Sequence, residues 1–155
     1  RMTDIQAAVG REQLKRLPEI IEKRRNLATR YKALLKNIPG IGLPEEPEWA
    51  RSTWQSFCIR LPAGVDQRKV MQFMLDKGIA TRRGVMCSHR EESYPKGTWS
   101  CASIKVGCNC VGGACQKLKH SEVAQDRAII LPLYPQMTFD EQDSVVNALK
   151  NSLCI

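Results

Sequence analysis

The chain has 155 residues, of which 43% are hydrophobic and 26% are charged, a composition that fits one globular domain large enough to bury a core. No apolar run approaches the roughly 20 residues that cross a bilayer, and no signal segment is seen, so we expect a cytoplasmic protein outside the membrane. The net charge of +8 lies on helical segments where lysines and arginines alternate with glutamates. This pattern is typical of a solvated surface and disfavours nucleic acid as a partner.

Two amphipathic helices are predicted at the start of the chain. A Thr-x-x-Gln capping box starts the first helix near Asp4, only two residues after the first residue of the chain. Pro18 occupies a position that proline favours at the start of a helix. Apolar residues then recur at helical spacing up to Asn37, and a Pro-Gly pair ends this second helix.

The middle of the chain is predicted to hold two strands and one helix. A strand is expected over residues 54–61, where apolar and polar side chains alternate. Asp66 should cap the next helix, which ends at Gly78, and the second strand should follow over residues 79–85. The helix residues that we expect to point inward are Val70, Met71, Met74 and Leu75.

The last third adds a short helix from about Ser121, a strand over residues 128–131 and a final helix. A second capping box, Thr138 with Glu141, starts that helix. Its expected inward stripe is Phe139, Val145, Val146, Leu149 and Leu153. The order of elements predicts an α/β fold, a small two-layer sandwich in which helices cover one face of a three-stranded, mainly antiparallel sheet.

Four stretches of sequence carry a family resemblance. The chain opens with Arg-Met-Thr-Asp-Ile-Gln-Ala-Ala-x-Gly-x-x-Gln-Leu, and Ser-Thr-Trp-Gln-Ser-Phe-Cys-Ile-Arg-Leu follows at residues 52–61. Lys-Gly-Ile-Ala-Thr-Arg at residues 77–82 leads to His89, and Leu-Pro-Leu-Tyr-Pro-Gln-Met-Thr spans residues 131–138. In this order the stretches resemble the small C-terminal domain of the DegT-type sugar aminotransferases, which are fold type I enzymes dependent on pyridoxal phosphate (PLP).

The resemblance implies that residues 1–155 are one domain, a fragment whose first helices would pack on a missing N-terminal large domain. In the full-length homodimer, PLP would carry an amino group from an amino acid, often glutamate, to a nucleotide-linked keto-sugar. The family holds PLP as a Schiff base on a large-domain lysine, and no lysine of this chain lies in a matching segment. We therefore expect the fragment to bind no PLP, to contain no catalytic residue and to be inactive by itself.

The resemblance also implies which residues bind. Arg1 would belong to an Asn-x-Arg element at the cofactor phosphate of the neighbouring subunit. Arg82 and His89 match the strand and loop that face the substrate, with Arg83 and Tyr94 as further candidates. The planar fork of an arginine suits a phosphate or a carboxylate. Judged from the residues without the family, the two strand arginines would be an exposed strand end and the histidine a surface residue.

The seven cysteines are the other unusual feature. Residues 95–118 are rich in cysteine and glycine and depart from the family pattern, so we predict a surface insertion. The Cys-x6-Cys-x-Cys-x4-Cys spacing is not a standard zinc or iron–sulfur spacing, which leaves open a metal site, disulfides or free thiols in a disordered loop. A metal-stabilised basic interaction module around this segment is the alternative function. Its candidate ligands are Cys101, Cys108, Cys110 and Cys115.

Overall fold

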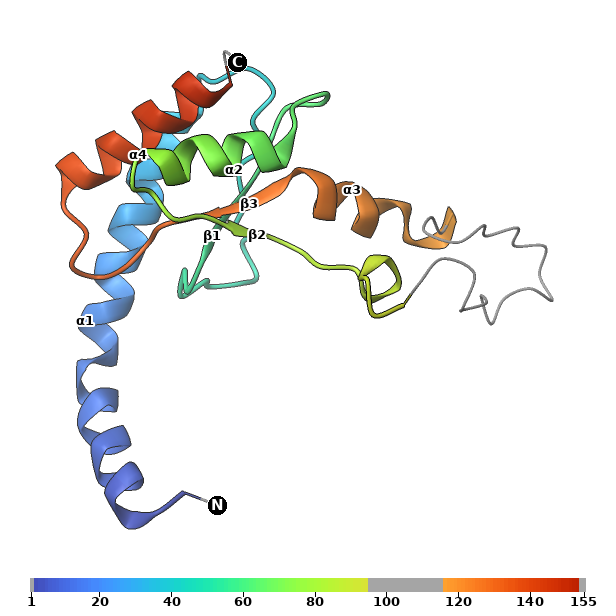
Figure 1. The fold of residues 1–155 in the computed structure, drawn as a ribbon. Helices are drawn as coiled ribbons and strands as arrows, with labels where there is room; N and C mark the ends of the chain where they lie inside the picture. The colour runs from blue at the N-terminus through green and yellow to red at the C-terminus, as the bar shows by residue number, and fades with distance from the viewer. Residues whose placement is uncertain (1, 95–115, 154–155) are drawn as a thin grey trace.

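The computed structural model describes residues 2–94 and 116–153. Its helices are α1 (Asp4–Leu35), α2 (Gln67–Asp76), α3 (Lys119–Arg127) and α4 (Phe139–Ser152) (Figure 1). The strands are β1 (Phe57–Arg60), β2 (Arg82–Arg83) and β3 (Ala128–Leu131), and the 3-10 turns are η1 (Ser88–Arg90) and η3 (Gln116–Leu118). The predicted order of helices and strands is confirmed except at the start of the chain.

α1 is one continuous helix, so the predicted break at Pro18 is wrong. Pro18 lies inside the helix, where it lacks the N–H that would bond the Leu14 carbonyl, but its fixed φ is helical. Leu14 and Leu17 are exposed, so water can reach the carbonyl that the proline leaves without a donor. The predicted start is confirmed, because Thr3 and Gln6 form the capping box.

The sheet has the strand order β1-β3-β2, with both pairs antiparallel. Phe57 lies opposite Leu131 and Ile59 opposite Ile129, and these apolar side chains are buried. They form one face of the sheet, which packs with α1, α2 and α4 around a single core. The predicted two-layer α/β sandwich with a three-stranded antiparallel sheet is confirmed.

The first two strands are shorter than predicted. Trp54 has a φ of 51°, a left-handed conformation that a strand does not accept, so β1 begins only at Phe57. β2 has two residues, because its partner β3 follows α3 directly and pairs with β2 only through Ile129 and Ile130. The left-handed conformation of Trp54 thus limits β1, and the pairing with β3 limits β2.

Most predicted core positions of α2 and α4 are buried or half-buried, and two are exposed. Val70 and Met74 of α2 and Val145, Val146 and Leu149 of α4 lie in the core. Leu75 is exposed, and Phe139 is 63% exposed, which corrects the prediction that both point inward. Phe139 opens α4, where the Arg30 guanidinium lies 4.7 Å from the centre of its ring, a cation–π contact that partly shields it.

The N-terminal half of α1 extends away from the sheet (Figure 1). Its apolar side chains are not covered by the described residues of this chain, and Ile5 is 79% exposed. The exposed apolar residues at this end are Met2, Ile5, Val9, Leu14 and Leu17.

Candidate functional site

Arg82 and Arg83 lie on opposite faces of the sheet. Arg82 is paired with Ile130 and Arg83 with Ile129, and directly opposed residues of an antiparallel pair point to the same side. Since Ile129 faces the core, Arg83 lies on the helix-covered side, and its Nη2 is 3.7 Å from Oε1 of Glu91. Arg82 lies on the uncovered face and is exposed. The two candidates therefore belong to different surfaces.

Gly84 sets how closely the end of β2 approaches the sheet. A Cβ atom at this position would lie 2.5 Å from the Cys58 sulfur and 2.7 Å from the Ala128 Cβ, closer than side-chain atoms pack. Its N–H donates to the Ala128 carbonyl at 2.8 Å. A glycine is therefore needed where the chain leaves the uncovered face toward η1.

His89 is on η1, and its ring contacts α3. His89 Nε2 lies 2.7 Å from Oε1 of Glu122, and the two side chains are only 13% and 16% exposed. The expectation from the residues alone, that His89 is a surface residue, is therefore wrong. The sequence did not indicate this partner, because the two residues are 33 positions apart, and no local spacing rule connects them.

Arg90, the residue after His89, also connects η1 to α3. Arg90 Nη1 donates to Oδ1 of Asp126 at 2.9 Å and to the Glu122 carbonyl at 3.3 Å. Burial raises the pKa of the Cys87 thiol at the start of η1, which keeps it protonated. Tyr94 is exposed, and its backbone N–H donates to the Glu91 carbonyl at 2.9 Å. The structure thus positions His89 firmly and Tyr94 only through its backbone.

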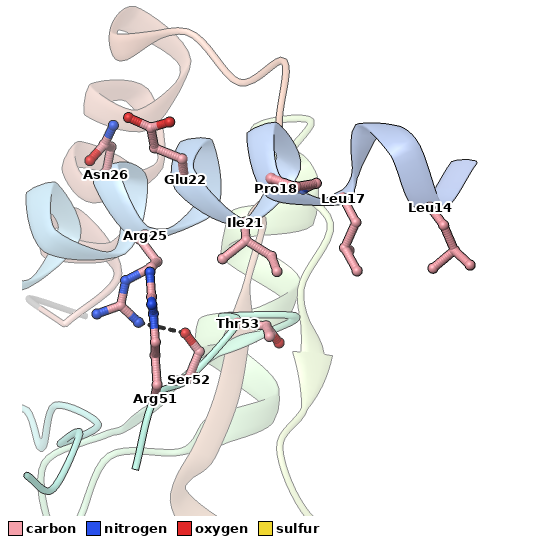
Figure 2. Close-up of a pocket in the computed structure, with 10 residues that line it drawn as sticks. All are labelled: Leu14, Leu17, Pro18, Ile21, Glu22, Arg25, Asn26, Arg51, Ser52 and Thr53. Carbon is pink, nitrogen blue, oxygen red and sulfur yellow. Dashed lines mark hydrogen bonds between the residues drawn. The ribbon is translucent and has the colours of Figure 1, made fainter. Parts of the chain in front are cut away.

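One hollow lies beside Arg83 and Arg90, and a second lies along α1. One, of about 470 Å³, is lined by charged and amide side chains from β2, α2, α3 and the chain after η1. The other, of about 800 Å³, lies between the apolar side of α1 and residues 51–53 (Figure 2). Arg25 stands in the wall of the larger hollow, where its Nη1 donates to the Ser52 carbonyl at 2.6 Å and contacts Oε1 of Glu46 at 3.0 Å. The sequence did not indicate this hollow.

The comparison with known proteins decides the family. Residues 1–150 match the DegT/DnrJ/EryC1/StrS aminotransferase family. The chain belongs to this family. The resemblance read from four sequence stretches is confirmed.

Relatives of this DegT-family chain are much longer than the chain. The dTDP-4-dehydro-2,3,6-trideoxy-D-glucose 4-aminotransferase of Saccharopolyspora spinosa is 30% identical over 151 residues, which are 97% of this chain and 34% of that protein. The aminotransferase TlmJ from Streptoalloteichus hindustanus shares the fold, with a TM-score of 0.78 at 23% identity over 99% of this chain and 37% of its own. The structure of ntda from Bacillus subtilis with bound cofactor PMP has a TM-score of 0.73 at 28% identity, over 100% of this chain and 33% of its own. The chain spans about a third of the length of these relatives.

PLP sets three requirements for its site in a protein of this DegT family. PLP needs a lysine amine, a partner for its ring nitrogen and a ligand for its phosphate. Two of the described hollows have a lysine in the wall, Lys77 in one and Lys150 in the other. Neither contains an acidic or arginine side chain, so neither of these two hollows fits the cofactor.

Several predicted residues lie outside the described part of the chain: Arg1, Cys101, Cys108, Cys110 and Cys115. Among residues 2–94 and 116–153, no group of three or more histidine, cysteine, aspartate or glutamate residues could hold a metal ion. No helix in these ranges is both long enough and apolar enough to span a membrane.

Proposed function

We propose that this chain is the C-terminal small domain of a full-length, PLP-dependent aminotransferase of nucleotide-sugar biosynthesis. The observation that carries the proposal is the family match over residues 1–150, with 97% of the chain aligning to 34% of the S. spinosa relative. The rest of such a protein would contain the large domain. The exposed apolar side of α1 is a surface suited to pack against it, as large exposed apolar patches usually are.

The proposed reaction transfers an amino group from an amino acid, with glutamate as the proposed donor, to a keto-sugar linked to a nucleotide. PLP, when bound to the full-length protein, would take up the amino group and release it to the sugar. Two relatives support this reaction class. The name of the S. spinosa protein specifies a dTDP-linked dehydro-sugar, and ntda binds PMP, the amine form of the cofactor.

Arg82 is the proposed ligand of an anionic group, either a nucleotide phosphate or the carboxylate of the donor. Its support is its place on the uncovered face of the sheet, exposed at the end of β2. Its guanidinium can give two parallel hydrogen bonds to such an anion. His89, which ends the same stretch, is the second proposed substrate ligand. Arg83 and Tyr94 rank behind them, because Arg83 lies on the face opposite Arg82 and Tyr94 is positioned only through its backbone N–H.

The proposed assembly is a cytoplasmic homodimer in which Arg1 contacts the cofactor phosphate of the neighbouring subunit. The sequence resemblance at the start of the chain supports this part of the proposal. It implies that residues 1–155 contribute a substrate wall and part of an interface. The chain would therefore be inactive without the large domain.

The test uses the full-length protein that the gene encodes, with PLP, glutamate and dTDP-4-dehydro-2,3,6-trideoxy-D-glucose. We expect an aminated nucleotide sugar and 2-oxoglutarate by mass spectrometry, and no product from residues 1–155. Arg82→Ala should raise the KM for one of the two substrates about tenfold. The matched control, Lys69→Ala at an exposed position of α2, should leave KM unchanged.

Two results would contradict the proposal. The proposed reaction would be contradicted by a full-length protein that aminates no nucleotide keto-sugar with any amino donor. Amino transfer by residues 1–155 without a large domain would show that the catalytic groups lie within this chain.

A further inference from the structure

The contact between His89 and Glu122 joins the predicted substrate-side loop to a helix that the sequence did not implicate. His89 Nε2 and Glu122 Oε1 are 2.7 Å apart, and both side chains are mostly buried at 13% and 16% exposure. A contact this short in a partly dry site is stronger than the same contact in water. Glu122 is therefore well placed to fix the orientation of the imidazole ring.

The chemistry of the His89–Glu122 pair determines which atom carries the hydrogen in their contact. An ionised carboxylate only accepts hydrogen bonds, so Nε2 must carry the hydrogen in this contact. This holds for the neutral and for the protonated imidazole. Rotation of the ring would break the contact and leave a mostly buried carboxylate without this donor, which costs free energy. The ring orientation is thus coupled to the presence of Glu122.

The next turn of α3 provides a comparison. Asp126 lies one helical turn after Glu122 and accepts from Arg90 Nη1 at 2.9 Å. Both carboxylates connect η1 to α3, yet only Glu122 touches the imidazole of His89. Asp126→Ala therefore removes a connection between η1 and α3 without removing the contact to the imidazole, whereas a role in orienting the histidine should belong to Glu122.

We propose that Glu122 is a positioning residue that holds the His89 imidazole, through its Nε2–H, in the orientation required for binding the sugar substrate. This inference rests on the proposed function, in which His89 contacts that substrate. Glu122 acts through the histidine and is not itself a substrate ligand. Its effect should therefore appear in substrate binding and should disappear when His89 is removed.

The first experiment observes the contact in residues 1–155. The chain has two histidines, so selective 15N labelling gives two ring systems, and exposed His120 serves as the internal reference. We expect a slowly exchanging Nε2–H proton for His89, lost in Glu122→Ala and retained in Glu122→Gln and Asp126→Ala. Circular dichroism of each variant verifies the fold. A fast-exchanging His89 proton in the wild type, or an unchanged one in Glu122→Ala, would overturn the inference.

The second experiment measures kinetics in the full-length enzyme. Glu122→Ala should raise the KM for the nucleotide sugar about tenfold with kcat within about twofold, as expected for the loss of a charge-assisted hydrogen bond. Glu122→Gln should restore KM to within about threefold of wild type, because its amide oxygen still accepts. Asp126→Ala should leave KM within about twofold and should lower Tm less than Glu122→Ala does, because the Asp126 side chain is 56% exposed and exposed ion pairs contribute little.

A double-mutant cycle decides between the two roles. His89→Ala should raise KM, and Glu122→Ala added to it should raise KM no further, because the two residues act as one unit. Additive effects, or an equal rise in KM in Asp126→Ala, would overturn the inference while leaving the proposed function intact. A full-length protein without aminotransferase activity would instead overturn the proposed function and this role with it.

Discussion

The hydroxyl of Tyr31 donates a hydrogen bond to the carbonyl of Pro132, 2.9 Å away. The tyrosine is fully buried on α1, its ring stacks on Phe57 with 5.1 Å between centroids, and Pro132 follows β3. Burial strongly raises the pKa of the Tyr31 hydroxyl, so it remains a donor at neutral pH. This contact fastens the long helix to the turn that leaves the sheet.

Tyr31→Phe should lower the free energy of unfolding by about 1–2 kcal/mol, because it leaves a carbonyl without its donor while the ring packing stays. Urea unfolding monitored by circular dichroism measures the change. Tyr94→Phe, at an exposed position, is the matched control and should unfold like the wild type. Equal stabilities for Tyr31→Phe and wild type would show that the hydrogen bond contributes nothing.

Gly84→Ala should destabilise the fold by about 1–3 kcal/mol, as overpacking typically does. The added Cβ would collide with Cys58 and Ala128 at 2.5 and 2.7 Å. Gly10→Ala is the control, since nothing lies within 4 Å of its added Cβ and alanine in a helix is about 1 kcal/mol better than glycine. In thermal unfolding, Gly84→Ala should lower Tm and Gly10→Ala should raise it. Changes of the same sign would contradict the close packing at Gly84.

The capping box of α4 should make stability depend on pH in the acid range. The Thr138 backbone N–H, 2.7 Å from the Glu141 carboxylate, lowers the pKa of that carboxyl. A lowered pKa in the folded state adds stability above the ordinary glutamate pKa and loses it as pH falls through the folded value. Wild type should therefore exceed Glu141→Gln in stability at neutral pH, and the difference should shrink as pH falls below the ordinary glutamate pKa. A gap that stays constant with pH would argue against the carboxylate contact.

Residues 1–155 should self-associate through the exposed side of α1. The apolar side chains there, with Ile5 79% exposed, gain free energy when any surface covers them. Replacing Ile5 and Val9, which share one face of α1, by glutamine should shift the sedimentation coefficient toward that of a monomer. Leu75→Gln, at an exposed position of α2, is the control and should leave the sedimentation coefficient unchanged. A wild-type chain that sediments as a monomer at all concentrations would contradict this prediction.

The segment Cys101–Cys115 should be dispensable for folding, as the sequence predicts for a surface insertion. Its deletion should change Tm little, because loops tolerate changes in length at small entropic cost. A chelator should have no effect on cooperative unfolding. If chelation unfolds the chain, a structural metal site is present, and the metal-stabilised module becomes the better account of this segment.

Local signals in the sequence determined the helix starts and the strand β3. The caps Thr3, Asp66 and Thr138 were predicted and are confirmed, because a cap depends on backbone groups within three residues of itself. The apolar run over residues 128–131 was likewise sufficient to place β3. Family membership also followed from the sequence, since its motifs are short and contiguous.

Tertiary structure decided the features that depend on partners far away in the chain. The alternation of a strand separates Arg82 from Arg83, but only the pairing with Ile130 and Ile129 determines which arginine faces away from the core. Glu122 reaches His89 because α3 folds back beside η1. Helix continuity through Pro18 also departs from the local rule. For the two arginines and for His89, the deciding contact joins residues whose separation in sequence carries no periodic signal, so only the packed chain brings them together.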